Sequence, residues 1–393
     1  MKYKNIQLKD VADIVMGQSP KSVFYNTNGN GIPFLQGVRT FGENYPQIDT
    51  WTTSYNRKAK SGEILFSVRA PVGRVNWANQ DLAVGRGLAA LKIKSGYSKE
   101  YLYYLFKKIG GQLDSLATGT VFTSINKKEL EALELKIPVN LSDQEKIADY
   151  LQKFDQEIEL NNQINDNLLK LAKTKFWQIY LLPTDEFKMV PNGWEIASFS
   201  KIMTFSNGHN FKSNEMLKKY EPLTYKVFKQ GNILIGGGLN ELGTKSWIQK
   251  GKVTKLNKYV LKKWDLLMAM TDMKNKVAIL GNTALMNCSN QYILNQRVGL
   301  IRSNNYNGTS PAYLFLLTNS KPFLHSIRSK AHSGVQVNLS SKEIRDTDVI
   351  IAPKNVNDGF NTFVKPIFDR IMVNQLENLT LNELKQTLLN RLF

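Results

Sequence analysis

The 393-residue chain has few of the residues that build disulfides, metal sites and catalytic triads. Cys288 is the only cysteine, so an internal disulfide cannot form. The three histidines, His209, His325 and His332, are too few for a zinc cluster and too scattered for a Ser-His-Asp arrangement. We therefore expect no metal site and no catalytic centre of these kinds.

Long apolar runs and paired prolines are missing as well. No stretch approaches the roughly 18 consecutive apolar residues that span a bilayer, and the first ten residues lack the apolar core of a signal peptide. The sequence thus predicts a cytoplasmic chain that does not enter a membrane. None of the 12 prolines is adjacent to another, which excludes the Pro-Pro-aromatic signature of adenine methyltransferases. Gly236-Gly237-Gly238 lacks the Lys-Ser or Lys-Thr ending of a phosphate-binding loop.

Positive charge, by contrast, is abundant. The chain has 52 Lys and Arg against 33 Asp and Glu, a formal net charge of +19, and its pI is about 9.6. Such a basic composition is the electrostatic footprint of nucleic-acid binding. A polyanion is therefore the expected partner, and a merely soluble basic protein or one bound to anionic lipid is the alternative.

The two halves of the chain repeat each other, as expected of a chain long enough for two domains. Near the start of each half, the apolar residues Ile6, Leu8, Val11 and Ile14 align with Trp194, Ile196, Phe199 and Ile202. Further matches are Gly62-Glu63-Ile64-Leu65 with Trp264-Asp265-Leu266-Leu267, Gly85-Arg86 with Gln296-Arg297, and Lys128-Glu129-Leu130 with Lys342-Glu343-Ile344.

Between these matches, short apolar runs such as 64–68 and 277–280 are bounded by turn residues and indicate strands. Segments 99–109 and 311–317 indicate helices. In each half, the run of short strands and helices ends at a proline, Pro138 in the first half and Pro353 in the second. The sequence predicts two mixed α/β domains, residues 1–140 and 184–353, in an α+β protein.

After each proline, apolar residues recur at the alternating spacing of a coiled-coil seam. Segments 141–183 and 354–393 are predicted to be long helices that pair in an antiparallel coiled coil with pseudo-twofold symmetry. A helix of about 36 residues is roughly 54 Å long. The expected pairing residues are Ile147, Leu151, Phe154, Ile158, Asn161, Asn165 and Leu168 in the first helix, and Phe360, Val364, Ile367, Ile371, Asn374, Asn378 and Leu381 in the second.

Asparagines on the seam penalise any register in which they lack a polar partner. Pro366, where the first helix has Lys153, would kink the second helix or mark its true start. Packing of each helix on its own domain alone is the alternative to pairing. Segment 144–180 has five Lys and six acidic residues, and segment 356–393 has four basic and four acidic. The positive surplus therefore lies in the two α/β domains.

These features together resemble the specificity subunits of type I restriction-modification systems, over essentially the whole chain. The motifs that carry the resemblance are Gly17-Gln18-Ser19-Pro20, Thr118-Gly119-Thr120, Leu141-Ser142-Asp143-Gln144-Glu145-Lys146-Ile147-Ala148 and Pro191-Asn192-Gly193-Trp194. No one of them is very specific, but their order within a repeated chain is. The second helix departs from the first, with Val356-Asn357-Asp358-Gly359 in place of Ser-Asp-Gln-Glu.

The resemblance implies two target-recognition domains, each reading one half of a bipartite DNA site, and a helix pair that fixes the gap between the halves. It implies a chain that is not an enzyme by itself and holds no cofactor. Two modification subunits would supply adenine methylation with S-adenosylmethionine, and restriction subunits would supply ATP- and Mg-dependent translocation and cleavage.

Side chains that match base edges or phosphates are expected in the polar, glycine-punctuated loops of both domains. The candidates in the first domain are Gln18, Ser19, Lys21, Gln36, Arg39, Arg69, Arg74, Thr118 and Thr120. The candidates in the second are Lys212, Lys245, Lys274, Lys276, Arg328, Lys330, His332, Ser333 and Gln336. A solvated surface charge or turn residue is the alternative for each. Arg86 and Arg297, which align in the repeat, are expected to be structural.

Two other classes of function are open at this point. A stand-alone or fused restriction endonuclease could use Glu134-Leu135-Lys136, because an acidic residue and a lysine at this spacing recur in metal-dependent nuclease cores. A non-enzymatic scaffold that binds proteins rather than DNA is the other.

Overall fold

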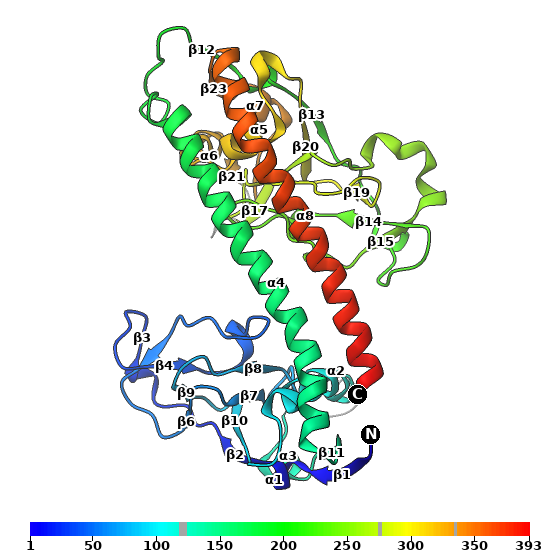
Figure 1. The fold of residues 1–393 in the computed structure, drawn as a ribbon. Helices are drawn as coiled ribbons and strands as arrows, with labels where there is room; N and C mark the ends of the chain where they lie inside the picture. Colours follow the sequence, from blue (N-terminus) through cyan, green and yellow to red (C-terminus); the bar gives the residue numbers. More distant parts are fainter. Residues whose placement is uncertain (118–123, 274–276, 334–335) are drawn as a thin grey trace. The chain divides into compact units, whose positions relative to one another are not determined.

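The computed structural model describes residues 1–117, 124–273, 277–333 and 336–393. Its contacts divide the chain into two compact units. Unit 1 comprises Met1–Glu159 and Leu379–Phe393, and unit 2 comprises Leu160–Asn378. Both units mix sheets and helices (Figure 1), which confirms the predicted α+β fold.

Unit 1 contains two main sheets, in the strand orders β2-β10-β7-β8 and β3-β5-β4-β9-β6, and a separate pair, β1-β11. All neighbouring strands are antiparallel except β4 and β9, which are parallel. The strands are β1 (Tyr3–Gln7), β2 (Ala12–Met16), β3 (Tyr25–Asn26), β4 (Ile32–Leu35), β5 (Trp51–Thr52), β6 (Lys58–Ala59), β7 (Ile64–Ser67), β8 (Val75–Trp77), β9 (Leu82–Val84), β10 (Leu88–Ile93) and β11 (Glu134–Pro138). The helices are α1 (Leu8–Val11), α2 (Lys99–Ala117), α3 (Lys127–Glu131) and the first part of α4 (Leu141–Phe176).

Strand β10 shows how the core of unit 1 is layered. Successive side chains of a strand point to opposite faces of its sheet. Ala89 and Leu91 join the cluster that contains α2, whereas Leu88 and Ala90 join a second cluster on the other face. Burial on both faces explains why this strand is a continuous apolar run rather than an alternating one.

Unit 2 repeats this plan, with sheets in the orders β13-β20-β16-β18, β15-β14-β19 and β17-β22-β21, and the pair β12-β23. Here the parallel neighbours are β14 and β19. The strands are β12 (Glu195–Ser198), β13 (Met203–Asn207), β14 (Thr224–Phe228), β15 (Trp247–Gln249), β16 (Leu266–Ala269), β17 (Thr271–Met273), β18 (Thr283–Leu285), β19 (Tyr292–Leu294), β20 (Val298–Ser303), β21 (His332–Ser333), β22 (Gln336–Asn338) and β23 (Asp348–Ile351). The α-helices are α5 (Pro311–Thr318), α6 (Lys321–Ser329), α7 (Ser341–Arg345) and the first part of α8 (Lys354–Leu392).

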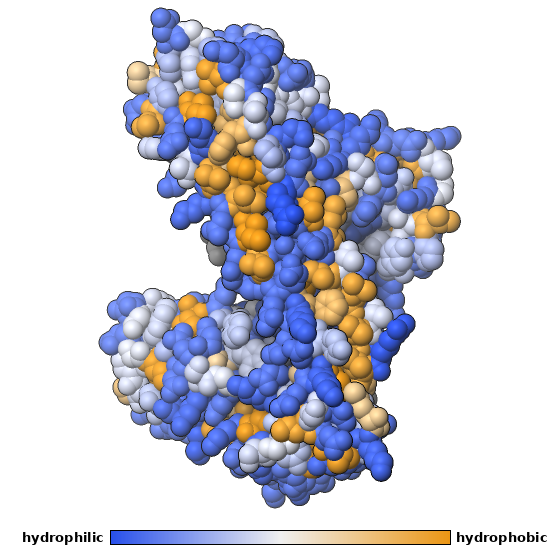
Figure 2. Space-filling view, viewed as in Figure 1, coloured by the Kyte–Doolittle hydropathy of each residue, from blue (hydrophilic) through white to orange (hydrophobic). Residues whose placement is uncertain are grey.

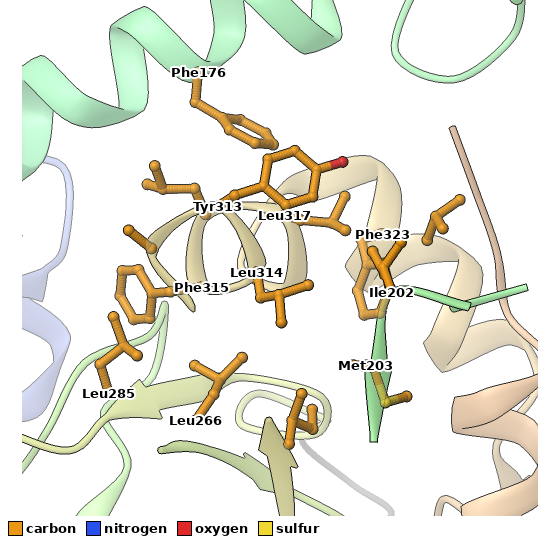
Figure 3. Packing of buried hydrophobic residues seen from close by; sticks show 14 of the residues in the cluster. Phe176, Ile202, Met203, Leu266, Leu285, Tyr313, Leu314, Phe315, Leu317 and Phe323 are labelled. Carbon is orange, nitrogen blue, oxygen red and sulfur yellow. The ribbon is translucent and has the colours of Figure 1, made fainter. Parts of the chain in front are cut away.

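The core of unit 2 lies between the sheet β13-β20-β16-β18 and the helices. Helix α5 is buried from Ala312 to Thr318, and Figure 3 shows its side chains between the strands and α4. The Phe176 ring of α4 lies 5.7 Å, centroid to centroid, from the Tyr313 ring. The end of α4, which continues as a π-helical turn over Trp177–Leu181, is thereby packed on this domain.

Backbone hydrogen bonds fix how the two halves correspond. Leu8 N donates to Leu133 O at 2.9 Å, and Phe199 N donates to Thr347 O at 2.8 Å. Leu8 is thus equivalent to Phe199, so the expected alignment of Val11 with Phe199 is wrong by three residues. A shift of three residues is almost one helical turn and places apolar residues on apolar residues, which is why the pattern alone did not reveal it.

The capped helices near the end of each domain follow the predicted repeat. Asn126 caps α3 and forms a capping box with Glu129, while Ser340 caps α7 and forms one with Glu343. In both cases the cap satisfies backbone N–H groups that the first helical turn leaves without partners. The match of Lys128-Glu129-Leu130 with Lys342-Glu343-Ile344 is confirmed.

In unit 2 the second part of α4 and the first part of α8 run antiparallel. Asn161 Nδ2 donates to Asn378 Oδ1 at 3.0 Å, and Asn374 Nδ2 donates to Asn165 Oδ1 at 2.9 Å. The seam alignment treats Asn161 as equivalent to Asn374 and Asn165 as equivalent to Asn378. The two bonds therefore exchange under a pseudo-twofold axis, as the repeat predicts.

The first turns of both helices also pack on a domain core. Ile147 and Leu151 of α4 belong to the core of unit 1, together with Leu389 of α8. Phe360 and Val364 of α8 belong to the core of unit 2. Helix pairing and packing on the domain therefore occur together, and the two are not alternatives.

Helix α8 runs through Pro366 without a break, so this proline does not mark the helix start. Proline leaves the carbonyl of the residue four positions earlier, Thr362, without its helical hydrogen bond. Both residues are exposed, so water can hydrogen-bond that carbonyl. Among the described helices, none is both long and apolar enough to cross a bilayer.

Candidate nucleic-acid interface

Three chain segments of unit 1 meet where β2, β4 and β9 end; we call residues 17–19, 35–37 and 85–87 the junction. Gly17 N donates to Leu88 O at 2.8 Å, and Gln18 N donates to Val84 O at 2.9 Å. Gly85 N donates to Leu35 O at 2.8 Å. These bonds hold the backbones of the three segments together and leave polar side chains on the surface.

Glycine makes this close approach possible. A Cβ on Gly17 would lie 2.1 Å from the carbonyl oxygen of Gly85, and a Cβ on Gly85 would lie 2.8 Å from Cα of Gln36. Real Cβ atoms do not approach backbone so closely, so the glycines are required by the contact and not by a turn.

The unit 1 junction borders a surface depression of about 640 Å³. Its lining includes polar and basic side chains suited to nucleic acid, among them Ser19, Lys21, Gln36, Arg39 and Arg86. Sequence reasoning selected the first four, and the structure brings them together. It assigned Arg86 a structural role, whereas its side chain is exposed at this surface.

Arg39 is held by a carboxylate. Its guanidinium donates to both carboxylate oxygens of Asp49, at 2.7 and 2.8 Å. The hydrogen bonds from Arg39 and Thr50 keep the pKa of Asp49 below its ordinary value. The pair uses one N–H of each terminal nitrogen, so Asp49 balances the charge of this exposed guanidinium but leaves its other N–H donors unengaged.

Unit 2 has an equivalent junction, formed by residues 208–210, 228–230 and 295–297. Gly208 N donates to Val298 O at 3.2 Å, and His209 N donates to Leu294 O at 3.1 Å. Asn295 N donates to Phe228 O at 3.1 Å. A Cβ on Gly208 would meet the carbonyl oxygen of Asn295 at 2.1 Å, the same contact that Gly17 makes with Gly85.

This register corrects the expected alignment around Arg86. Because Leu88 is equivalent to Val298, Arg86 is equivalent to Gln296, and Arg297 is equivalent to Gly87. The shared arginine suggested the wrong alignment by one residue. The two arginines therefore do not occupy one structural position.

Unit 2 also has a strongly basic segment, of which sequence reasoning selected only Lys245. Residues 245–263, the lysine-rich segment, hold seven lysines and no acidic residue. The segment forms β15 and the 3-10 helix η7 (Lys250–Tyr259), and Lys252, Lys255 and Lys258 are exposed. Tyr259 lies 5.4 Å from the His209 ring, so η7 borders the unit 2 junction. The signal that could have found it is the run of one charge sign itself.

The remaining candidates of unit 1 lie on a second loop. Arg69 and Arg74 are exposed, on either side of Pro71. Ser67 Oγ donates to Pro71 O at 2.6 Å and accepts from Arg74 N at 2.8 Å, which shapes this loop. Thr118 and Thr120 lie outside the described residues.

The remaining candidates of unit 2 are dispersed. Lys212 and Lys245 are exposed, and Lys330 Nζ donates to Asp346 O at 3.3 Å. His332 and Ser333 lie on β21 and Gln336 lies on β22. Lys274 and Lys276 lie outside the described residues.

Arg328 serves the fold rather than an open surface. Its Nε donates to Leu280 O at 2.9 Å and its Nη2 donates to Ala278 O at 3.1 Å. Burial lowers its pKa, and the nearby Asp272 carboxylate counteracts this effect. The guanidinium holds the 278–282 loop, so the structure argues against DNA contact by this residue.

The residues of the nuclease alternative do not form a metal centre with their neighbours. Glu134 and Lys136 are exposed on β11, opposite Gln7 and Asn5 of β1. Across the described part of the chain, no group of three or more His, Cys, Asp or Glu side chains is placed to hold a metal.

The chain is a duplicated cationic protein: two copies of one α/β domain carry the positive charge, and the long helices have no positive surplus. Comparison with known proteins identifies the family of the chain. The family described as "Type I restriction modification DNA specificity domain" matches residues 1–170 and 191–392. The chain therefore belongs to this family and carries its domain twice.

Individual relatives agree with this assignment. The putative type I restriction enzyme MjaX specificity subunit of Methanocaldococcus jannaschii is 39% identical over 169 residues, which are 43% of this chain and 39% of that relative. The MjaIX specificity subunit of the same organism is 24% identical over 413 residues, 98% of this chain and 91% of that relative. The crystal structure of a type I restriction-modification S subunit from M. genitalium has the same fold, with a TM-score of 0.62 and 16% identity, over 100% of this chain and 96% of that one.

Proposed function

We propose that this chain is the DNA-reading subunit of a type I restriction-modification complex and that each unit reads one half of a bipartite site. The observation that carries the proposal is the repeated junction, which sets equivalent polar side chains on the surface of both units. The net charge of +19 supplies the attraction to phosphate that specific reading requires. The specificity subunits that match the chain support a non-catalytic role.

The gap between the half-sites would be set by the helices. Helices α4 and α8 each pass without a break from one unit into the other. A helix has a fixed rise of 1.5 Å per residue, so the number of residues in the helix sets its length, whatever its side chains are. The asparagine bonds in unit 2 hold the pair in one register.

Two modification subunits would dock on these helices. Leu160, Leu171 and Trp177 on the α4 side and Val373 on α8 are half exposed, although apolar side chains of a stable helix pair normally turn inward. Figure 2 shows hydrophobic residues over both helices. Beside Trp177 a shallow groove is lined by residues such as Leu169, Lys173 and Thr174. Such a patch is typical of a protein contact.

The chemistry would come from these partners. In this proposal the modification subunits transfer a methyl group from S-adenosylmethionine to adenine, and restriction subunits use ATP and Mg to translocate and cut DNA. The chain itself would hold neither cofactor and would act in the cytoplasm, where the DNA of its cell lies.

Methylation mapping of the source genome with and without this gene tests the proposal. We expect one bipartite adenine-methylation motif to disappear on deletion and to return when the gene is supplied again. Persistence of every such motif after deletion would show that another subunit reads the site.

The purified chain should also pull down a methyltransferase subunit, and a variant with Leu171→Glu and Trp177→Glu should lose that subunit but keep its affinity for DNA.

A further inference from the structure

Equivalent positions of the two junctions carry different side chains on the same backbone hydrogen bonds. Unit 1 has Arg86 where unit 2 has Gln296, and Ser19 where unit 2 has Asn210. The exchange of one hydrogen-bonding side chain for another is what two different DNA half-sites require.

The backbone N–H groups of Arg86 and Gln296 are both held by hydrogen bonds. Arg86 N donates to Ser19 Oγ at 3.1 Å, and Gln296 N donates to His209 O at 2.7 Å. The root of each side chain is therefore fixed, and Arg86 is exposed while Gln296 is half-buried. An arginine fork matches O6 and N7 of guanine, whereas a glutamine amide matches N6 and N7 of adenine.

Arg297 has a backbone conformation that favours glycine. Its φ is +66°, in the left-handed region that L side chains rarely adopt, whereas its equivalent in unit 1, Gly87, has no positive φ. Trp264 also has a positive φ, of +74°, but its ring packs against the core of unit 2. Arg297 is exposed, so packing does not explain why an arginine stands there.

From these observations we infer that Arg86 specifies a guanine in the half-site of unit 1, and that Gln296 and Arg297 specify an adenine and a guanine in the half-site of unit 2. This assignment rests on the proposed function and goes beyond it by naming which side chains set which base. Arg328, whose guanidinium donates to backbone carbonyls within the fold, has no such role.

Methylation mapping with the complete complex tests the assignment. Arg86→Gln copies unit 2 and should change one guanine of one half-site to adenine, with the other half-site and the gap unchanged. Arg297→Gly should relax one guanine of the other half-site and leave the folded chain at least as stable, because glycine suits its φ. Binding to the original motif should fall about tenfold or more in each case.

Arg57→Gln is the matched control, since it removes the same charge from an exposed arginine of unit 1 outside the junction. It should leave every base of the motif unchanged. An unchanged motif in both Arg86→Gln and Arg297→Gly, with methylation retained, would overturn the base assignment and leave the proposed function standing. The opposite failure is separate, because methylation that survives deletion of the gene overturns the proposed function itself.

If a variant abolishes methylation, a binding measurement can still test the base assignment. Binding of its purified complex to a pool of duplexes that vary one base at a time would then be measured. A new preference at one position of one half-site supports the assignment, whereas equal loss on all duplexes overturns it.

Discussion

Single residues decide whether the junctions form, and the clearest case is Gly17. The carbonyl oxygen of Gly85 occupies the space that a side chain at position 17 would need. That obstacle is backbone, which cannot rotate away as a flexible side chain can. Gly37, in the same junction, has an extended backbone with φ of −175°, and apart from its two chain neighbours no residue has an atom within 4 Å of the place that a methyl group would take there.

Gly17→Ala should therefore lower the free energy of unfolding by about 1–3 kcal/mol, the usual cost of forcing extra volume into a packed site. Gly37→Ala should change it by less than about 1 kcal/mol. Urea unfolding of both variants, followed by circular dichroism, measures the difference. Equal stability of the two variants would contradict the close approach of residues 17 and 85.

At the scale of elements, the two ends of the helix pair differ in polarity. In unit 1, Lys385 Nζ of α8 lies 2.7 Å from Asp155 Oδ1 of α4 and 2.9 Å from Glu43 Oε1. The seam alignment makes Ala172 and Phe368 the equivalents of Lys385 and Asp155, and both are buried in the apolar core of unit 2. Burial lowers the pKa of Lys385, but the charges and hydrogen bonds of Asp155 and Glu43 outweigh it, so the pKa is raised.

Removal of one partner from this pair should be costly. Lys385→Ala leaves the Asp155 carboxylate, whose side chain is 12% exposed, without its cation and should cost about 3 kcal/mol of stability. The double variant with Asp155→Phe and Lys385→Ala copies unit 2 and should recover part of that loss, because an apolar pair can replace a buried ion pair.

Lys153→Ala provides the control for these variants. Its surface pair with Asp149, at 2.8 Å, is worth less than about 1 kcal/mol. Thermal unfolding of the three variants would rank them, and a double variant less stable than Lys385→Ala would show that the ion pair is not replaceable.

At the scale of the whole molecule, the sequence pattern predicted the architecture better than it predicted which side chains contact each other. The duplication, the two long helices and the basic domains follow from periodicity and charge, which are properties of the chain itself. Arg328 and Arg39 could not be distinguished from free arginines, because their partners, the Leu280 carbonyl and the Asp49 carboxylate, become neighbours only in the fold. The alignment of Arg86 failed for the same reason, since strand register and not residue identity sets equivalence.

Charge placement yields a prediction for the full chain. Replacement of Lys252, Lys255 and Lys258 by alanine removes three exposed charges from the lysine-rich segment. Each lost phosphate contact should reduce the slope of log affinity against log salt by about 0.9, so the slope should fall by up to about 3 in a DNA-binding titration. The recognised bases should not change, because phosphate contacts carry no sequence information.

A matched variant separates placement from net charge. Replacement of Lys146, Lys170 and Lys173, which are exposed on α4, removes the same number of charges from the helices. Since the helices carry no positive surplus, this variant should keep the salt slope of the original chain. An equal fall in both variants would mean that DNA responds to total charge and not to the lysine-rich segment.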